Sequence, residues 1–358
     1  MKLNEISSHT SEWFGGSGPL ADVVVSSRVR LARNVAGFQF LSHCSVSQKA
    51  QILEKLKDAV MNLDLGDNVF YVGIDKAPVL DKDVLVERHL ISRHHAHAKG
   101  PRGVVIASRE FFTAMINEED HLRIQVFKAG LQLRDCWKQI SEIDDMIEQK
   151  IDYAFHPRYG YLTACPTNVG TALRASVMLH LPGLVFVNQI NQVLQAIVKL
   201  GLAVRGLYGE GTEASGNLFQ ISNQVTLGIT EEDIVTNLQK VINQIIGHEK
   251  KARQALYQKN RKALEDRVCR AYGLLSSARI ISSKETIDLL STLKLGLDFQ
   301  LVDFDLGSIN ELFIITQPAH LQKQAGKELK PEERDILRAD LIREKLWAKK
   351  KREKGNKS

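Results

Sequence analysis

Residues 165–182 read CPTNVGTALRASVMLHLP and place a thiol, a Pro-Thr-Asn turn, a glycine and an arginine beside a hydrophobic stretch. A strand that serves only packing seldom carries Asn168, Gly170 and Arg174 in so short a space. Few structural elements need this mixture of residue types. The segment therefore indicates a functional site inside a folded domain.

The chain as a whole has the composition of a water-soluble protein. Its 358 residues are 44% hydrophobic and 25% charged, and a chain of this length is expected to form two domains. No apolar run approaches the length of a membrane span, and the first residues, MKLNEISSHTSEWF, lack the pattern of a signal peptide. These features predict a cytoplasmic protein without a membrane partner.

The cysteines and the net charge restrict the kinds of ligand. Cys44, Cys136, Cys165 and Cys269 lie far apart without a CxxC pair, so they predict free thiols rather than disulfides or a zinc site. The net charge of +6 suits an anionic ligand such as a nucleotide. Nucleic acid is an alternative, but much of the excess lies in the tail 347–358, which is expected to be disordered and solvated.

The pattern of apolar and polar residues predicts a mixed α+β region to about residue 248 and a mainly helical region after it. Strand-like runs are followed by charged helical patterns with recognisable caps. The expected strands are 69–74, 103–108, 123–127, 202–208 and 218–227, with a hairpin over 153–163. The expected helices are 48–63 after Ser47, one after Thr230, 249–272 ending at Gly273, one from Ser282 to Gly296, and one from Pro331.

Arginine dominates the segments that carry chemistry. Arg28 and Arg30 lie in SSRVRLAR after an apolar run, so both are expected on one face of a strand. Arg123, Arg174 and Arg205 also lie in strand-like, apolar contexts. A guanidinium stays charged and bonds phosphate oxygens bidentately. Each arginine alone fits a surface ion pair, but the five together predict a phosphate-binding site.

Four segments then resemble a known family. SSRVR, NEEDHLR, CPTNVGTALRASV and RGLYGEGTEASGNLFQISN are similar, in this order, to the blocks of the ATP:guanidino phosphotransferases, the arginine and creatine kinase superfamily. The resemblance covers roughly residues 20–250. It implies an α+β fold in which an antiparallel sheet flanked by helices forms the catalytic domain. The implied division is an N-terminal segment 1–22, a catalytic domain 23–248, a helical domain 249–346 and the basic tail 347–358.

The resemblance also implies a nucleotide site for ATP. Phosphoryl transfer has a loose transition state, so the protein contributes alignment and charge stabilisation. Mg²⁺ is expected to arrive with ATP and to be held mainly by phosphate oxygens, with no metal site made by the protein. The implied ATP-binding residues are Ser26, Ser27, Arg28, Val29, Arg30, His89, Arg123, Arg174, Ala175, Ser176, Val177, Met178, Arg205, Gly206, Leu207, Tyr208, Gly209 and Glu210.

Three residues are implied to act on the acceptor. Paired carboxylates hold a planar guanidinium and take its proton, and the resemblance assigns Glu119 as the base and Glu210 as its partner. Cys165 becomes the thiol that flanks the acceptor. Taken alone, residues 118–120 fit an exposed acidic loop better, and Cys165 also fits a small buried hydrophobe.

Two departures narrow the resemblance. Metabolite kinases of the superfamily carry a helical domain before the SSRVR block, whereas here that block begins at Ser26. The metabolite arginine kinases also usually carry an arginine where this chain has Tyr208. Both departures, with RDILRA at 334–339, resemble the bacterial protein-arginine kinases. There this motif forms a second, allosteric pocket for phosphoarginine, which implies Arg334, Asp335, Arg338 and Ala339 as its ligands here; the alternative is a surface salt-bridge ladder.

The sequence therefore predicts an ATP-dependent protein-arginine kinase that makes phosphoarginine. The resemblance implies protein substrates with exposed arginine, an activator protein, a proteolytic chaperone complex, a role in stress-related proteolysis, and a homodimer or larger oligomer. The alternatives are a kinase of free arginine or another small guanidino metabolite, an inactive phosphoarginine-binding adaptor, and a basic nucleic-acid binder. His94, His95 and His97 fit an exposed loop better than a metal site.

Overall fold

The computed structural model describes residues 11–206 and 215–355, with side chains up to Trp347. Its centre is an eight-stranded sheet in the order β2-β3-β4-β5-β1-β8-β10-β9, in which all neighbours are antiparallel. This arrangement confirms the predicted α+β fold. The strands are β1 (Val24–Arg33), β2 (Val69–Gly73), β3 (Gly103–Ala107), β4 (Phe112–Ile116), β5 (Leu122–Ala129), β8 (Leu173–His180), β9 (Leu202–Gly206) and β10 (Leu218–Asn223), with a separate hairpin of β6 (Phe155–His156) and β7 (Gly160–Tyr161).

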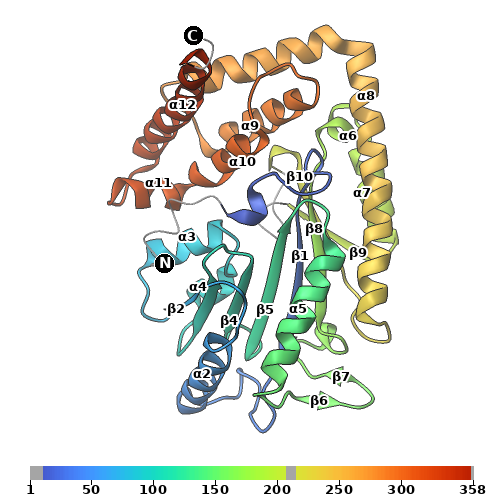
Figure 1. Ribbon diagram of the computed structural model, residues 1–358, viewed down its shortest axis with the longest axis vertical. Helices are drawn as coiled ribbons and strands as arrows, with labels where there is room; N and C mark the ends of the chain where they lie inside the picture. Colours follow the sequence, from blue (N-terminus) through green and yellow to red (C-terminus); the bar gives the residue numbers. More distant parts are fainter. Residues whose placement is uncertain (1–10, 207–214, 356–358) are drawn as a thin grey trace.

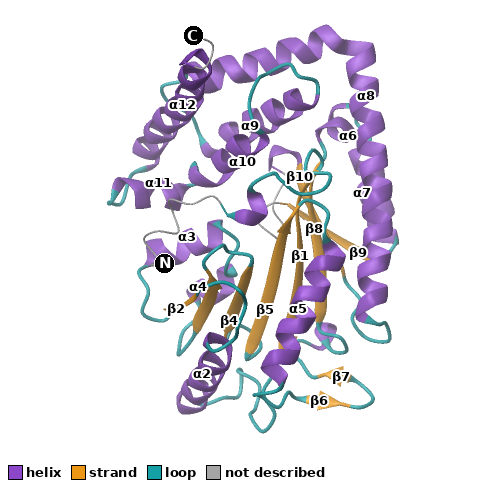
Figure 2. Ribbon diagram, in the orientation of Figure 1, coloured by secondary structure: helices purple, strands orange, loops and turns teal. Residues whose placement is uncertain are grey.

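Helices surround the sheet and form a separate group beyond one end of its strands (Figure 1, Figure 2). The helical elements are η1 (Glu12–Phe14), α2 (Val46–Met61), α3 (Val79–Glu87), α4 (Arg93–His97), α5 (Leu133–Glu148), η2 (Pro166–Asn168), α6 (Pro182–Phe186), α7 (Ile190–Lys199), η3 (Ser215–Asn217), α8 (Glu231–Ser277), α9 (Ser283–Asp298), α10 (Leu306–Ile315), α11 (Pro318–Ala325) and α12 (Pro331–Gly355). No described helix is both long and apolar enough to cross a membrane.

One face of the sheet packs against helices α2, α5 and the first half of α8. Helix α5 shows why, because Cys136, Ile140, Ile143 and Ile147 recur every three or four residues and are buried. Alternate strand residues meet them, such as Val29, which is fully buried. This face forms the main hydrophobic core.

The opposite face is covered in two places. Helices α3 and α4 pack on strands β2 to β4, and a second cluster joins η1 to helices α8, α9, α10 and α12 over Phe127 and Met178. Figure 1 shows these C-terminal helices beyond one end of the sheet. The central strands β1 and β8 therefore keep part of this face for polar side chains.

Helix α2 begins two residues before the expected start, so the prediction of Ser47 as its cap was wrong. Ser45 is the N-cap, and its hydroxyl accepts from the backbone N–H of Gln48 at 3.2 Å. The Gln48 side chain accepts in turn from the backbone N–H of Ser45 at 2.9 Å. The helix therefore begins after Ser45, because Ser47 has no partner three residues further on that could form this reciprocal pair.

The long helix α8 differs most from expectation. Its 47 residues begin directly after the predicted cap Thr230 and continue past Gly273 to Ser277, so the helix does not end at that glycine. Its only non-helical residue in the described chain is Asn260, at φ −135° and ψ 39°. The expected domain division at residues 248 and 249 falls within this helix. Buried residues on both sides of that point, such as Ile246 and Ala252, belong to the same hydrophobic core.

The later helices agree with the predicted caps but extend further. Ser282 caps α9 through the N–H of Glu285, and Pro331 opens α12 as predicted. Helix α9 ends at Asp298 rather than Gly296, which packs against Val268 of α8 inside the helix. Helix α12 continues to Gly355, so the backbone of 347–355 is helical where a disordered tail was predicted.

Candidate active site

The register of the central strands brings the predicted arginines together. Arg30 on β1 lies directly opposite Arg174 on β8, and Arg28 lies opposite Ser176 of the same strand. On the other side of β8, Gln220 of β10 pairs with Arg205 of β9. Because side chains alternate between faces, these residues share the face that the main core does not use. We call this surface the arginine face.

Arg28, on the arginine face, has two neutral hydrogen-bond acceptors. Arg28 donates to the Ser176 hydroxyl at 3.4 Å and to the Gln220 carbonyl oxygen at 3.1 Å. Burial, with repulsion from Arg174 and Arg205, lowers the pKa of Arg28 to about 10. A buried guanidinium that lies among like charges favours an anionic ligand.

Arg30 is the clearest member of this cluster. Its Nε is buried and has no hydrogen-bond partner among the described residues. Burial lowers the pKa of Arg30 well below its usual range, and Arg28, Arg174, Arg123 and Arg205 lower it further. The chain thus holds a donor ready for an acceptor that the described protein does not supply, as a phosphate oxygen would.

The loop before β5 carries three carboxylates that converge on Arg123. Its guanidinium contacts Glu118 at 2.6 Å and Asp120 at 3.0 Å, and it also pairs with Glu119. Asp120 is fully buried and Glu118 nearly so, whereas the Glu119 side chain is 43% exposed. An exposed acidic loop, the alternative that the motif alone favoured, is therefore wrong for Glu118 and Asp120.

Asp120 also fixes the segment that contains the thiol. Its Oδ1 accepts from the side-chain amide of Asn34 and from the backbone N–H of Ala164, both at 2.8 Å. Ala164 immediately precedes Cys165, whose Sγ lies 3.0 Å from the Thr167 hydroxyl. The buried carboxylate therefore holds the acidic loop and the thiol segment at a constant separation.

A cavity of about 360 Å³ joins these parts. Its positive wall comes from β1, β8 and β9, and its acidic and thiol-bearing wall comes from the two loops. Six of the predicted site residues line it, namely Arg30, Glu119, Arg123, Cys165, Arg174 and Arg205, together with Leu31, Ala32, Thr167, Asn168, Ala172, Leu173, Asn223, Gln224 and Thr226.

His89 lies beyond the cavity, next to Trp13 and Arg28. Its backbone is left-handed, with φ 58°, and its carbonyl accepts from the Gln125 side chain at 3.1 Å. The ring packs edge-on against Trp13 with 5.8 Å between centroids. Burial, with Arg28 and Arg93, lowers the pKa of His89 to about 3, which favours a neutral ring.

The remaining predicted ATP residues divide between the two faces. Ser176 and Met178 share the arginine face, whereas Val29, Ala175 and Val177 point into the main core. Ser26 is buried two residues before Arg28, Ser27 donates its hydroxyl to the Gly130 carbonyl, and Gly206 ends β9. Leu207, Tyr208, Gly209 and Glu210 lie outside the described residues.

The RDILRA residues lie in the first turns of α12, away from the arginine face. Arg338 is 1% exposed, and its guanidinium donates to the carbonyls of Thr316 at 2.8 Å and Ile281 at 2.9 Å. It also pairs with Asp335, one turn earlier. Ala339 is buried beside it, and Arg334 is half-buried. Arg338 thus bridges three elements rather than forming a surface ladder.

The histidine triplet forms the short helix α4. His94 and His97 are exposed, but the prediction of an exposed loop was wrong for His95, which is buried with its Nε2 3.0 Å from the Gly103 carbonyl oxygen. Among residues 11–206 and 215–347, no group of histidine, cysteine and acidic side chains has the arrangement of a metal site. All four cysteines are free, as predicted.

Neutral polar residues of the site were missed by sequence reasoning. Gln125, Gln220 and Ser222 share the arginine face, where Ser222 accepts from Arg174 at 3.1 Å and Gln220 from Arg28. Asn223 lines the cavity and accepts from the backbone N–H of Ala175 at 2.8 Å. The available signal was a period of two, because Gln125 lies two residues after Arg123 on β5, and Gln220 and Ser222 lie two residues apart on β10.

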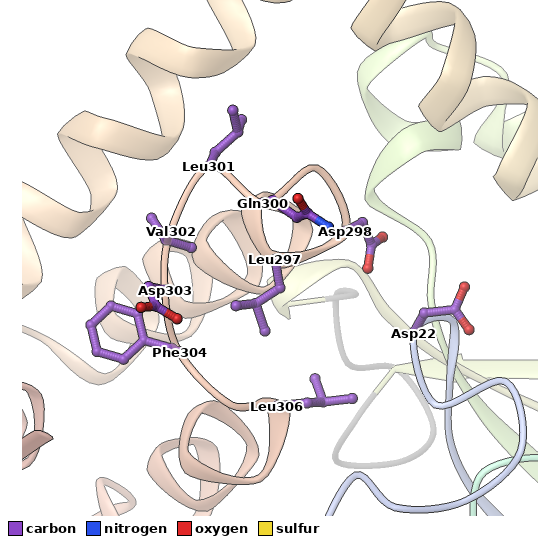
Figure 3. A pocket seen from close by; sticks show the side chains of 9 residues that line it. All are labelled: Asp22, Leu297, Asp298, Gln300, Leu301, Val302, Asp303, Phe304 and Leu306. Atoms are coloured by element: carbon purple, nitrogen blue, oxygen red, sulfur yellow. The ribbon is translucent and has the colours of Figure 1, made fainter. Parts of the chain in front are cut away.

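A second cavity, of about 700 Å³, lies between Asp22 and the turn that follows α9 (Figure 3). Asp22 and Asp298 are among the side chains that line it in Figure 3. Each of the two carboxylates has a cationic partner: Asp298 pairs with Arg253, and Asp22 pairs with Lys250. This cavity holds none of the predicted site residues.

Two family models match the chain in succession. Residues 51–252 match the ATP:guanido phosphotransferase C-terminal catalytic domain, and residues 261–357 match the protein-arginine kinase McsB C-terminal domain. A protein-arginine kinase of Halothermothrix orenii is 49% identical over 342 residues, which are 95% of this chain and 98% of that relative. The chain belongs to the protein-arginine kinase family. The two matched regions are separated by residues 253–260 of α8, the last of which is the irregular residue Asn260.

Solved structures place the protein-arginine kinase chain among guanidino kinases. A lombricine kinase aligns with a TM-score of 0.58 and 26% identity, over 68% of this chain and 70% of its own. The duplicated taurocyamine kinase of Schistosoma mansoni, solved with transition-state analogue components, aligns with a TM-score of 0.59 and 29% identity, over 66% of this chain and 34% of its own. The fold implied by the resemblance is therefore confirmed.

Proposed function

We propose that this protein is an ATP-dependent protein-arginine kinase that transfers the γ-phosphoryl group of ATP to arginine side chains of proteins. The observation that carries the proposal is the division of charge within one cavity. Arg30, Arg174 and Arg205 line one wall, and Glu119 lines another next to Cys165. A cavity with a cationic wall for phosphates and an acidic wall for a guanidinium suits transfer between these two groups.

The arginine face is the proposed binding surface for the ATP phosphates. The unpartnered Nε of Arg30 and the lowered pKa of Arg28 both support an anionic occupant. Arginine side chains stabilise the charge that develops on the transferring phosphoryl group. Mg²⁺ is proposed to bind mainly through phosphate oxygens, since the described residues offer no dedicated cage for it.

Glu119 is the proposed general base. Among the three carboxylates around Arg123 it is the most exposed, so it is the one that an acceptor can reach. The acceptor nitrogen would give a proton to Glu119, form its bond to the γ-phosphorus and displace ADP as the P–O bond breaks. Glu210 is the proposed second carboxylate on the guanidinium, by the family resemblance alone.

Cys165 is the proposed flanking group on the acceptor side. Its Sγ lies 3.0 Å from the Thr167 hydroxyl, which is able to donate to a thiolate. A thiolate at this position would add negative charge beside the acceptor guanidinium. The pairing of Glu119 with Arg123 means that the base must exchange Arg123 for the acceptor when the substrate binds.

The first experiment is mass spectrometry of an arginine-rich test protein after incubation with this protein and Mg-ATP, under non-acidic handling that preserves P–N bonds. Phosphate on arginine supports the proposal, whereas phosphate on serine, or none, contradicts it. A parallel assay with free arginine separates a protein kinase from a metabolite kinase. Turnover on free arginine that exceeds turnover on the protein would favour the metabolite alternative.

A regulatory role for α12 belongs to the same proposal. We infer that Arg334, Asp335, Arg338 and Ala339 contribute to a phosphoarginine site, which is supported by the match to the McsB C-terminal domain. We further propose that the protein oligomerises through its C-terminal helices and that it acts with an activator protein. Proteins marked under stress would be delivered to a proteolytic chaperone complex. Four free cysteines are compatible with a cytoplasmic location.

These regulatory parts have separate tests. Sedimentation should give a dimer or larger species at micromolar concentration, and a monomer would contradict the oligomer. Free phosphoarginine should change turnover in the native protein and have less effect in Arg334→Ala. Nucleic-acid binding that is lost on removal of residues 349–358 would instead support the basic binder.

A further inference from the structure

The turn that carries the proposed base joins β4 to β5 and is closed by its own backbone. The N–H of Asn117 donates to the His121 carbonyl at 2.8 Å. Inside that bond, the N–H of Glu118 donates to the Asp120 carbonyl at 3.1 Å. Asn117 has φ 61°, in the left-handed region. Glu119 lies at the tip of this turn, so its position depends on the groups that hold the turn.

Glu118 is the side chain that holds the tip. It is 6% exposed, and its Oε2 accepts from the backbone N–H of Glu119 at 2.8 Å and contacts Arg123 at 2.6 Å. Its Oε1 accepts from the Ser92 hydroxyl at 2.6 Å. Although burial opposes ionisation of Glu118, Arg123 and then the Ser92 hydroxyl hold its pKa below the usual range. One carboxylate thus holds the backbone of the base and the arginine that pairs with the base.

Ser92 is held in turn by the helix that follows it. As the N-cap of α4, its hydroxyl oxygen accepts from the backbone N–H of His95 at 2.9 Å. This capping bond uses the oxygen as an acceptor and leaves the hydroxyl hydrogen for Glu118. His94 Nδ1 lies 3.5 Å from the same carboxylate oxygen, but its side chain is 63% exposed. Ser92 is therefore the fixed donor to Glu118.

The sheet fixes the position of Ser92 from both directions along the chain. After it, His95 is fully buried, with its Nε2 3.0 Å from the Gly103 carbonyl oxygen at the start of β3. Before it, the Leu90 carbonyl accepts from the side chain of Gln125 on β5 at 3.1 Å. A hydroxyl held in this way has little freedom to follow a carboxylate that moves.

We propose that Ser92 is a positioning residue for Glu119 and acts through Glu118. The inference rests on the proposed function, in which the acceptor guanidinium displaces Arg123 from Glu119. Arg123 then keeps Glu118 and Asp120 as its carboxylate partners. Because Ser92 holds Glu118 in place, the exchange leaves the backbone of the base where the acceptor needs it.

The test separates the two hydrogen bonds of the Ser92 hydroxyl. Ser92→Ala removes both, Ser92→Asp keeps an acceptor for the His95 N–H but removes the donor to Glu118, and Ser92→Thr keeps both. We expect kcat for protein-arginine phosphorylation to fall roughly 10- to 100-fold in Ser92→Ala, since small misplacements of catalytic groups have effects of this size. Ser92→Asp should be at least as slow, because its carboxylate also repels Glu118. Ser92→Thr should restore most of kcat.

Two measurements and one control separate this role from capping and from nucleotide binding. Thermal unfolding should show that Ser92→Asp is folded, because aspartate is a favourable N-cap. The dissociation constant for ATP should stay within about twofold of the native value in all three variants, so that the loss appears in kcat. Ser282→Ala removes the serine cap of α9, which accepts from the Glu285 N–H at 3.2 Å, and should leave kcat unchanged.

A native kcat in Ser92→Asp would show that the serine serves only as a cap and would overturn the inference. Equal losses in Ser92→Ala and Ser92→Thr, an equal loss in Ser282→Ala, or a parallel loss of ATP binding would overturn it as well. In all of these cases the native protein still phosphorylates arginine, and the proposed function stands. A native protein that transfers no phosphate to arginine would overturn the proposed function and this inference with it, so the two failures are distinguishable.

Discussion

Arg30 on the sheet and Arg338 on helix α12 show two opposite uses of a guanidinium withdrawn from water. Arg338 donates to two backbone carbonyls and pairs with Asp335. Arg30 has no ion pair with a described residue, its Nε is unpartnered, and four other arginines repel it. The guanidinium of Arg338 is satisfied by its own protein, whereas the Nε of Arg30 is left for the proposed phosphate ligand.

This difference separates residues that hold the fold from residues that serve a ligand. A guanidinium that is fully hydrogen-bonded inside the protein stabilises the elements it connects, and its loss leaves unpaired acceptors. A guanidinium among like charges costs stability in the free protein and gains its partner only on binding. The sheet and the C-terminal helices should therefore respond to mutation in opposite ways.

The largest effect is expected at the acidic wall of the cavity. Glu119→Gln keeps the shape of the side chain and removes the base, so phosphoryl transfer should fall by about a thousandfold or more. Binding of ATP, measured by calorimetry, should change little, because the arginine face does not include this carboxylate. Loss of ATP binding together with transfer would contradict the assignment of Glu119 as the base.

The next effect is expected on the arginine face. Arg30→Ala should lower kcat/KM roughly 100-fold, because one charge-stabilising contact to the phosphoryl group is lost. The free energy of unfolding without nucleotide should stay the same or rise, since Arg30 is repelled by its neighbours. Arg109→Ala, an exposed arginine elsewhere, serves as the control. A clear loss of stability in Arg30→Ala would place Arg30 in the same class as Arg338.

Arg338→Met tests the opposite use of arginine. Removing the guanidinium leaves the carbonyls of Thr316 and Ile281 and the Asp335 carboxylate unpaired, so the free energy of unfolding should fall by roughly 3 kcal/mol. Urea unfolding measures this change. Arg334→Met, one turn away and half-buried, is the matched control and should change stability by less than about 1 kcal/mol. Equal effects of the two would remove the distinction.

The smallest effect concerns pH and a buried lysine of α9. Burial, with repulsion from Arg253, lowers the pKa of Lys294 to about 7. In the unfolded chain the ordinary pKa is about 10.4, so between these values the unfolded state holds a proton that the folded state lacks. Stability from this group therefore rises with pH from about 7 upward, by roughly 1–2 kcal/mol between pH 7 and 8.5.

Lys294→Met should remove that rise, because the methionine side chain does not titrate and fills a similar volume. Urea unfolding of both proteins at pH 7 and pH 8.5 gives the comparison, since all other titrating groups are shared. The native protein should gain more stability over this interval than the variant. An identical gain in both would show that Lys294 keeps its ordinary pKa in the folded protein.

Much of the sheet and the arginine face could be predicted from the sequence, because both depend on local patterns. The period of two places Arg28 and Arg30 on one face of any strand they form. Caps such as Thr230 and Ser282 act through backbone groups three residues away, and both were predicted correctly. The order of the blocks, by resemblance, was enough to indicate the family.

Only the tertiary structure decided which of these residues meet and which are buried. Arg30 faces Arg174 because β1 pairs with β8 in one register across 144 positions of sequence, which no local pattern specifies. Burial of Asp120 depends on Asn34 and Ala164, and burial of Arg338 depends on Thr316 and Ile281. Periodicity is a property of neighbours in the chain, whereas desolvation depends on all segments that pack around a group. The sequence by itself therefore determined the elements and the residue types of the site, and packing determined which charges a ligand must satisfy.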